Sequence, residues 1–214
     1  MLRRSVIASA IAMPLVLASG CAGIAPAGER FIAMPVGTVL TFSRASSGSF
    51  GSAGGQVVWT YGESTWQGRR VLDARNSVGT GTLHDPETFG VIANLNNSGQ
   101  PTMSYEPPVA LEWPLQVGKT WTTKHTVTVY PTGQKLPFEN TWNVEAFEKV
   151  TVPAGTFSAF RVVRTGSDGE VETRWVGLEL GVPLVKRVTS RTAAHRQGEG
   201  SQEADLVAVR VPGR

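Results

Sequence analysis

The chain of 214 residues contains a single cysteine, Cys21. One thiol cannot form an intramolecular disulfide, and it cannot supply the several thiolates of a structural zinc site. If Cys21 is modified, no thiol remains for nucleophilic catalysis. The folded part must then be stabilised by its core. Six tryptophans and eight phenylalanines can contribute to it, since each large aromatic side chain buries ~150–250 Å².

Long runs of one charge are also missing from the chain, which has 20 basic and 17 acidic residues. Lys186, Arg187, Arg191 and Arg196 come closest to a basic cluster, and we interpret them as solvated strand and loop positions. Nucleic-acid binding needs a concentrated basic stripe. We therefore expect no nucleic-acid partner.

Familiar catalytic and metal-binding motifs are missing as well. The chain has three histidines but no His-Glu-x-x-His, no phosphate-cradling glycine loop with lysine and no Gly-x-Ser-x-Gly. The serine-rich stretch 46–52 is typical of a hairpin loop. We therefore expect no cofactor and no metal site, and a non-enzymatic role is favoured.

The nearest approach to a reactive cluster is the stretch that contains His84, Asp85 and Glu87. An imidazole and two carboxylates this close can act as metal ligands or as an acid–base pair. Asp85 before Pro86 is equally typical of a turn, in which the same side chains would only be exposed. Trp113, in the predicted loop 107–116, is the tryptophan that packing explains least, so it is a candidate binding residue.

Among the features that are present, the N-terminus is the most informative. Arg3 and Arg4 precede an apolar stretch, residues 6–18. This stretch is shorter than the ~20 residues of a membrane-spanning helix, but it fits the ~7–15 apolar residues of a secretory signal peptide. We predict that residues 1–20 are a signal peptide. Without Arg3 and Arg4, 18 basic residues stand against 17 acidic ones, a net charge of +1.

The end of this segment, Ala18-Ser19-Gly20-Cys21, resembles the lipobox of bacterial lipoproteins. The resemblance implies cleavage before Cys21 and attachment of fatty acyl chains such as palmitate to this residue. Two or three such chains anchor a protein firmly, whereas one does so only marginally. In Gram-negative lipoproteins, aspartate after the cysteine commonly signals retention in the inner membrane. For a Gram-negative source, the resemblance with Ala22 at this position therefore implies the outer membrane, facing the periplasm. The expected partner is therefore the membrane, through the lipidated N-terminus.

The rest of the chain divides into a short tether and one β domain. Residues 21–34 are rich in small residues, as a tether would be, and we expect a single β domain over residues 35–214. No stretch after residue 30 shows helical periodicity over ten residues. Period-two alternation of β-branched and aromatic residues predicts strands instead. The expected strands are residues 37–44, 56–61, 69–75, 89–95, 120–130, 140–150, 156–165, 170–176, 183–191 and 204–211.

Glycine-rich turns between these segments favour antiparallel pairing, as in a β-sandwich or an open barrel. Residues 36–41 resemble residues 117–122, and residues 68–72 resemble residues 159–163. The two matches indicate either an internal duplication into two halves or chance similarity between β-rich segments. Either way, the expected fold class is all-β and antiparallel.

The stretch 150–157, Val-Thr-Val-Pro-Ala-Gly-Thr-Phe, resembles a Val-x-Val-Pro-Ala-Gly-x-Phe motif in exported, β-rich bacterial families of unknown function. Its physical role is structural, because Pro153 removes a hydrogen-bond donor from the ladder and Gly155 permits a positive φ. We expect a tight hairpin here. The resemblance implies a fold, not an activity.

Three functions remain open at this point. We expect a membrane-anchored envelope lipoprotein with a non-enzymatic binding or structural role toward an envelope protein, glycan or lipid. One alternative is a carrier of hydrophobic ligands, like the lipoprotein-localisation factors, which a large apolar pocket would favour. The other is a cell-envelope hydrolase, which requires His84 to converge with Asp85, Glu87 or serine side chains in a cleft.

Overall fold

The computed structural model describes residues 30–52 and 54–214. In this part of the chain there are twelve strands and no helix. The signal peptide and Cys21 lie outside the described residues. The strands are β1 (Val39–Gly48), β2 (Gly54–Trp66), β3 (Arg69–Asn76), β4 (Gly81–His84), β5 (Val91–Leu95), β6 (Pro101–Val109), β7 (Thr120–Val129), β8 (Gln134–Val152), β9 (Gly155–Gly166), β10 (Glu170–Gly177), β11 (Lys186–Arg191) and β12 (Gly200–Arg210).

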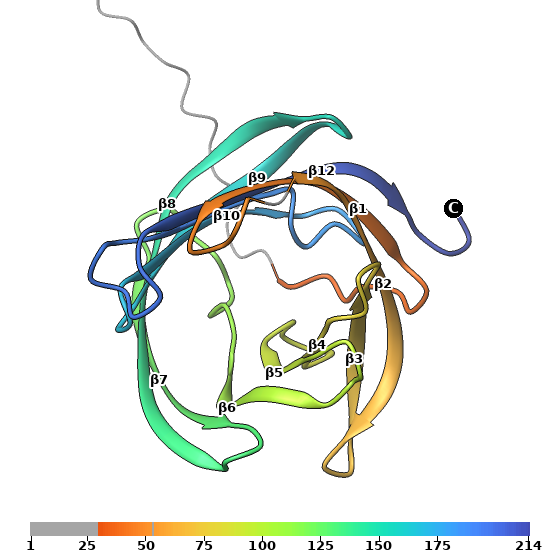
Figure 1. Ribbon diagram of the computed structural model, residues 1–214. Coiled ribbons are helices and arrows are strands. Elements are labelled where there is room, and N and C mark those ends of the chain that lie inside the picture. Colours follow the sequence, from red (N-terminus) through yellow and green to blue (C-terminus); the bar gives the residue numbers. More distant parts are fainter. Residues whose placement is uncertain (1–29, 53) are drawn as a thin grey trace, which may run out of the picture.

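Each strand pairs antiparallel with its neighbours in sequence, and β1 pairs with β12, so the sheet closes into a barrel. Figure 1 shows this ring, with β7 and β8 across from β2 and β3. The all-β antiparallel prediction is confirmed. Of the two expected architectures, a sandwich or an open barrel, the structure has the barrel, and it is closed because β1 pairs with β12. Closure leaves no sheet edge between the first and last strands, and thus removes a site of unwanted pairing.

The strand predictions failed mainly where proline or glycine is present. Neither β4, which begins with Gly81, nor β6 was predicted. In β6, Pro101, Pro107 and Pro108 each lack a ladder donor. The expected turn at Gly62 and Glu63 was wrong. These residues lie inside β2, paired with β3, and the chain turns at residues 67–68, both with positive φ.

The expected hairpin at residues 150–157 is confirmed. Strand β8 ends at Val152 and β9 begins at Gly155, with Val152 and Gly155 paired across a two-residue turn. Gly155 has φ +133°. The hairpin packs back on the barrel, where the amide of Ala154 donates to the carbonyl of Leu206 in β12 at 3.0 Å.

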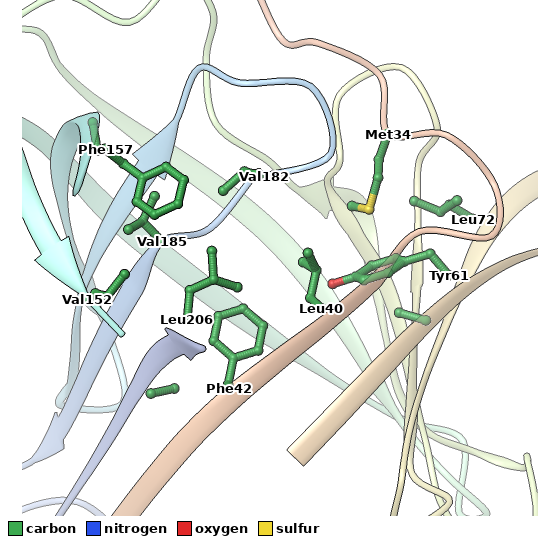
Figure 2. Close-up of a cluster of buried hydrophobic side chains, with 13 residues drawn as sticks. Met34, Leu40, Phe42, Tyr61, Leu72, Val152, Phe157, Val182, Val185 and Leu206 are labelled. Carbon is green, nitrogen blue, oxygen red and sulfur yellow. The ribbon is translucent and has the colours of Figure 1, made fainter. Parts of the chain in front are cut away.

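Buried side chains form three clusters. The largest, shown in Figure 2, joins β1 and β12 to the loop 178–185 and to the β8–β9 hairpin. In the picture Met34 lies beside Tyr61 and Leu72. A second cluster contains Leu115, Trp142, Val144, Phe160, Val162 and Val176. A third contains Val71, Leu83, Ile92, Ala93 and Leu95.

Two turns on opposite sides of the barrel have the same construction. The amide of Gly37 donates to the carbonyl of Tyr61 in β2, and that of Gly118 donates to the carbonyl of Val144 in β8. The two glycines have φ +90° and +87°. Each turn follows a buried side chain, Met34 in one and Leu115 in the other. Since β1 and β7 are six strands apart in a ring of twelve, this equivalence supports the duplication.

The segment before β1 belongs in part to the barrel. Met34 is buried in the largest cluster, and Phe31 stacks on the ring of Phe89 at a centroid distance of 5.7 Å. The last residues of the predicted tether therefore contact the domain. In the described part of the chain, no helix has the length and apolar character needed to cross a membrane.

Candidate functional site

The barrel encloses a cavity of about 810 Å³. Its walls come from the strands on both sides of the ring and from the loops between β4 and β5, between β6 and β7 and between β10 and β11. Small-molecule sites in proteins occupy ~300–1,000 Å³ and combine apolar walls with a few placed polar groups. The cavity has this size and composition, and it is the candidate site.

Aromatic rings gather at the end of the cavity where β1 begins and β12 ends. Phe31 stacks on Phe89 and lies 6.2 Å from the ring of Trp113. Phe89 also stacks on His84, with ring centroids 4.2 Å apart, and lies 6.1 Å from Tyr61. All five side chains line the cavity. We call this group the aromatic end: Phe31, Tyr61, His84, Phe89 and Trp113.

His84 lines the cavity with one ring nitrogen fixed by the backbone. Its Nδ1 lies 3.1 Å from the carbonyl oxygen of Phe89. Because a carbonyl only accepts, Nδ1 carries the proton and donates, and the lone pair is left on Nε2. Burial lowers the pKa of His84 to about 4, although the hydrogen bond to Phe89 opposes the shift. The side chain is therefore neutral at pH 7.

Arginine and glutamate side chains line the middle of the cavity and the end opposite the aromatic rings. Glu170 accepts hydrogen bonds from Arg164 at 2.7 Å and from Arg191 at 3.0 Å. Arg174 donates to Glu172 from Nε at 2.7 Å. Burial would raise the pKa of Glu172, but the charges of Arg174, Arg164 and Arg187 lower it to about 2. The carboxylate is therefore ionised.

Two further arginines of this wall, Arg44 and Arg187, have no such partner. Neither has a carboxylate within 4.0 Å among the residues that the structure describes. The Nε atom of each is buried without an acceptor. Arg187 donates one hydrogen bond, to the side-chain oxygen of Gln202 at 3.3 Å.

The structure separates the members of the predicted His84, Asp85 and Glu87 cluster. His84 lines the cavity, whereas Asp85 Oδ1 accepts hydrogen bonds from the amides of Glu87 and Thr88 within a turn. The other oxygen of Asp85 lies 3.6 Å from Arg69. Glu87 is exposed. The three side chains do not converge, and no group of three metal-ligating side chains occurs among the described residues.

Trp113 lies at the cavity, where it packs against the second core cluster and faces Phe31. Its indole nitrogen is buried without an acceptor among the described residues. The loop around it is held by Lys119, whose Nζ donates to the carbonyl of Glu112 at 2.7 Å. Trp113 therefore belongs to the wall of the candidate site. Cys21 is outside the described residues.

The arginine wall was not predicted from the sequence. We interpreted Arg187 and Arg191 as solvated, but both line the cavity. In β11, Arg187 and Arg191 alternate with the equally polar Lys186 and Ser190. Because both faces of β11 carry polar residues, the sequence does not indicate which face points into the barrel.

No protein-family model matches the sequence, and no curated protein matches it. Three solved structures resemble the fold. A Bacteroides fragilis protein described as exported, with a YmcC-like fold, has a TM-score of 0.47 and 11% identity, over 85% of this chain and 99% of its own. A Parabacteroides distasonis protein described as a lipoprotein has a TM-score of 0.42 and 10% identity, over 86% and 100%.

The hypothetical lipoprotein YmcC from Escherichia coli has a TM-score of 0.41 and 11% identity, over 79% of this chain and 83% of its own. At identities of 10–11% and TM-scores below 0.5, these likenesses identify neither a family nor a function for this chain.

Proposed function

We propose that this protein is a lipoprotein of the bacterial cell envelope whose barrel binds a lipid-like ligand. The observation that carries the proposal is the cavity of about 810 Å³, which is lined by aromatic and aliphatic side chains at one end. The proposal corresponds to the hydrophobic-ligand alternative considered from the sequence, in which a large apolar pocket was the deciding feature.

The apolar part of the cavity is continuous along the barrel. On β2, Val57, Trp59 and Tyr61 point to the same side because they alternate along the strand, and all three line the cavity. They lead from the arginine wall to the aromatic end, where the ring of Phe89 lies 6.1 Å from Tyr61. An acyl chain or another elongated apolar group fits such a lining.

The proposed anchor lies close to the aromatic end. Phe31 contacts Phe89 and Trp113 there, and it follows Cys21 by ten residues. Ten residues span at most ~35 Å. If Cys21 is acylated and held in the outer membrane, as its sequence context implies, the aromatic end stays within that distance of the bilayer. This placement favours exchange of lipid between the membrane and the barrel.

The hydrolase alternative has no support from the residues on which it was based. It required His84 to converge with Asp85, Glu87 or serine side chains. Asp85 is engaged in a turn, Glu87 is exposed, and the hydrogen bond that His84 makes goes to the carbonyl of Phe89 and not to a serine. His84 is instead fixed against Phe89. We therefore propose a binding role and no catalytic residue.

The test is binding of an apolar fluorescent probe, N-phenyl-1-naphthylamine, to the full chain in lipid nanodiscs, with empty nanodiscs as the blank. Val57→Trp places a large ring in the cavity, because Val57 is buried in its wall. Val78→Trp is the matched control, since Val78 is 61% exposed in a turn. We expect Val57→Trp to weaken binding by about tenfold or more and Val78→Trp to have no effect.

Two results would contradict the proposal. One is probe binding by the wild-type protein that does not exceed the blank. The other is equal binding by the wild type and by a Val57→Trp variant whose circular dichroism shows a native barrel.

A further inference from the structure

We propose that the ligand carries an anionic group, a carboxylate or a phosphate, and that Arg44 and Arg187 bind this group inside the barrel. The inference rests on the proposed function, because it assigns a head group to the ligand of the same cavity. It adds a chemical class and two binding residues to that function.

Positive charge exceeds negative charge on the cavity wall. Five arginines on the strands line the cavity, together with two glutamates on the strands, Glu170 and Glu172; two further arginines and two further acids line it from the loops, Arg30, Arg196, Asp168 and Glu179. Glu170 is shared by two of the arginines, and Glu172 is hydrogen-bonded to a third. Even with all four carboxylates ionised, the wall has an excess of positive charge. The five arginines are Arg44, Arg164, Arg174, Arg187 and Arg191.

Arg44 and Arg187 leave hydrogen-bond donors without acceptors. Arg187 has one hydrogen bond, to Gln202, and Arg44 has none among the described residues. Both side chains are half-buried, but the Nε–H of each is buried without an acceptor, and a buried donor without a hydrogen-bond partner is costly. A bound anion would supply the missing acceptors. Glu172 cannot do so alone, since it already neutralises Arg174.

The register of β11, β12 and β1 places Arg187 and Arg44 on either side of Ala204. Arg187 in β11 pairs with Ala204 in β12, and Ala204 pairs with Arg44 in β1. Residues paired directly across antiparallel strands point to the same face. Because neighbouring strands are ~4.8 Å apart, the two arginine backbones lie about 10 Å apart, with only a methyl group between them.

This arrangement suits an acid group. A guanidinium offers parallel N–H donors in a plane, and it binds carboxylate and phosphate oxygens in pairs. Two guanidiniums that flank the methyl group of Ala204 can approach one anion from both sides. The Nε donors of both arginines are unoccupied, so neither would have to break an ion pair in order to bind.

The apolar part of the same ligand has a defined direction. From Arg44 toward the start of β1, the next residue with the same orientation is Phe42, which lines the cavity. Val57 pairs with Phe42 on β2, and Trp59 and Tyr61 follow it toward the aromatic end. The acid group would thus lie at mid-barrel and the chain would point to the aromatic end.

The experiment compares three amphiphiles of equal chain length, decanol, decanoate and decyl phosphate. Their binding to the full chain in nanodiscs at pH 8 is measured by titration calorimetry against empty nanodiscs. We expect at least one anion to bind about tenfold tighter than decanol or more, as charge-assisted hydrogen bonds predict. A preference for one of the two anions identifies the head group as carboxylate or phosphate.

The assignment to these two arginines is tested by the double variant Arg44→Gln, Arg187→Gln. It is expected to bind the anions only as well as decanol, and to bind decanol as the wild type does. The matched control is Arg70→Gln, Arg210→Gln, since both residues are exposed outside the cavity. It is expected to keep the preference.

Each contrary outcome has a distinct meaning. Equal affinity of the wild type for all three amphiphiles overturns this inference and leaves the proposed function standing. Failure of all three to bind above the blank overturns both. An anion preference that survives in the double variant overturns the assignment to Arg44 and Arg187. The comparison on the wild-type protein needs no variant, so it decides the ligand class even if the double variant does not fold.

Discussion

At the scale of single residues, His84 shows how an environment changes the role expected from a motif. Next to Asp85 and Glu87 in sequence, it has the features of an acid–base group. In the fold its ring lies against Phe89 and donates to that residue's carbonyl, while the two carboxylates stay in the turn. Neutral His84 is therefore a wall residue with one acceptor, and its burial makes the protein sensitive to acid.

The pKa of His84, about 4 in the folded protein against 6.5 as the ordinary value, predicts a loss of stability on mild acidification. Between these values the unfolded chain binds the proton and the folded protein does not, so stability falls as the pH falls below 6.5. The expected loss is about 2 kcal/mol between pH 7.5 and pH 5. Urea denaturation at the two pH values measures it.

The variant His84→Gln provides the control, because its amide can still donate to the carbonyl of Phe89 but does not titrate. It should lose most of this pH dependence. Glu172 contributes little at pH 5, since its ordinary pKa is 4.5 and its folded pKa is about 2. A slope that is the same in the variant and the wild type would show that His84 is not the group responsible.

At the scale of elements, the paired turns before β1 and β7 show what a local pattern can establish. The similarity of residues 36–41 to residues 117–122 is visible in the sequence, and both turns have a positive-φ glycine bonded to the next strand but one in the chain. The sequence alone could not separate duplication from chance, because the matching hydrogen bonds to Tyr61 and Val144, which support a duplication, connect segments about 25 residues apart.

These turns predict the effect of alanine at Gly118. An added Cβ would meet no atom within 4 Å, so the cost comes only from the φ of +87°. We expect Gly118→Ala to lower the free energy of unfolding by about 1–2 kcal/mol, measured by urea denaturation. Gly54→Ala is the control, because Gly54 has no positive φ and its Cβ would lie 3.7 Å from the nearest atom. Equal effects at the two positions would contradict the explanation.

The same scale shows which strands could be predicted and which could not. Strand β7 alternates tryptophan, threonine and valine with period two, and it was predicted from that pattern. Strand β6 contains three prolines, which argue against a strand in any local rule. It forms nevertheless, because β5 and β7 pair with it from both sides over part of its length. Pairing with neighbouring strands depends on tertiary structure, so the sequence of residues 101–109 alone does not reveal it.

At the scale of the whole molecule, closure of the barrel creates the candidate site. The pairing of β1 with β12 joins residues near the two ends of the folded chain, and no local pattern predicts it. Without closure, Arg44 on β1 and Arg187 on β11 would not face one cavity across Ala204. The sequence predicted the class of fold and Trp113 and His84 as candidates, whereas the arginine wall required the ring.

The central claim is that an amphiphile binds inside the barrel, and the most direct measurement is anomalous diffraction from crystals of the protein with 10-bromodecanoate. We expect a bromine peak within the cavity, near Phe89 and Trp113, since the acid group would be held at Arg44 and Arg187. A well-diffracting crystal with bromine peaks only on the outer surface of the barrel, or with none, would contradict it.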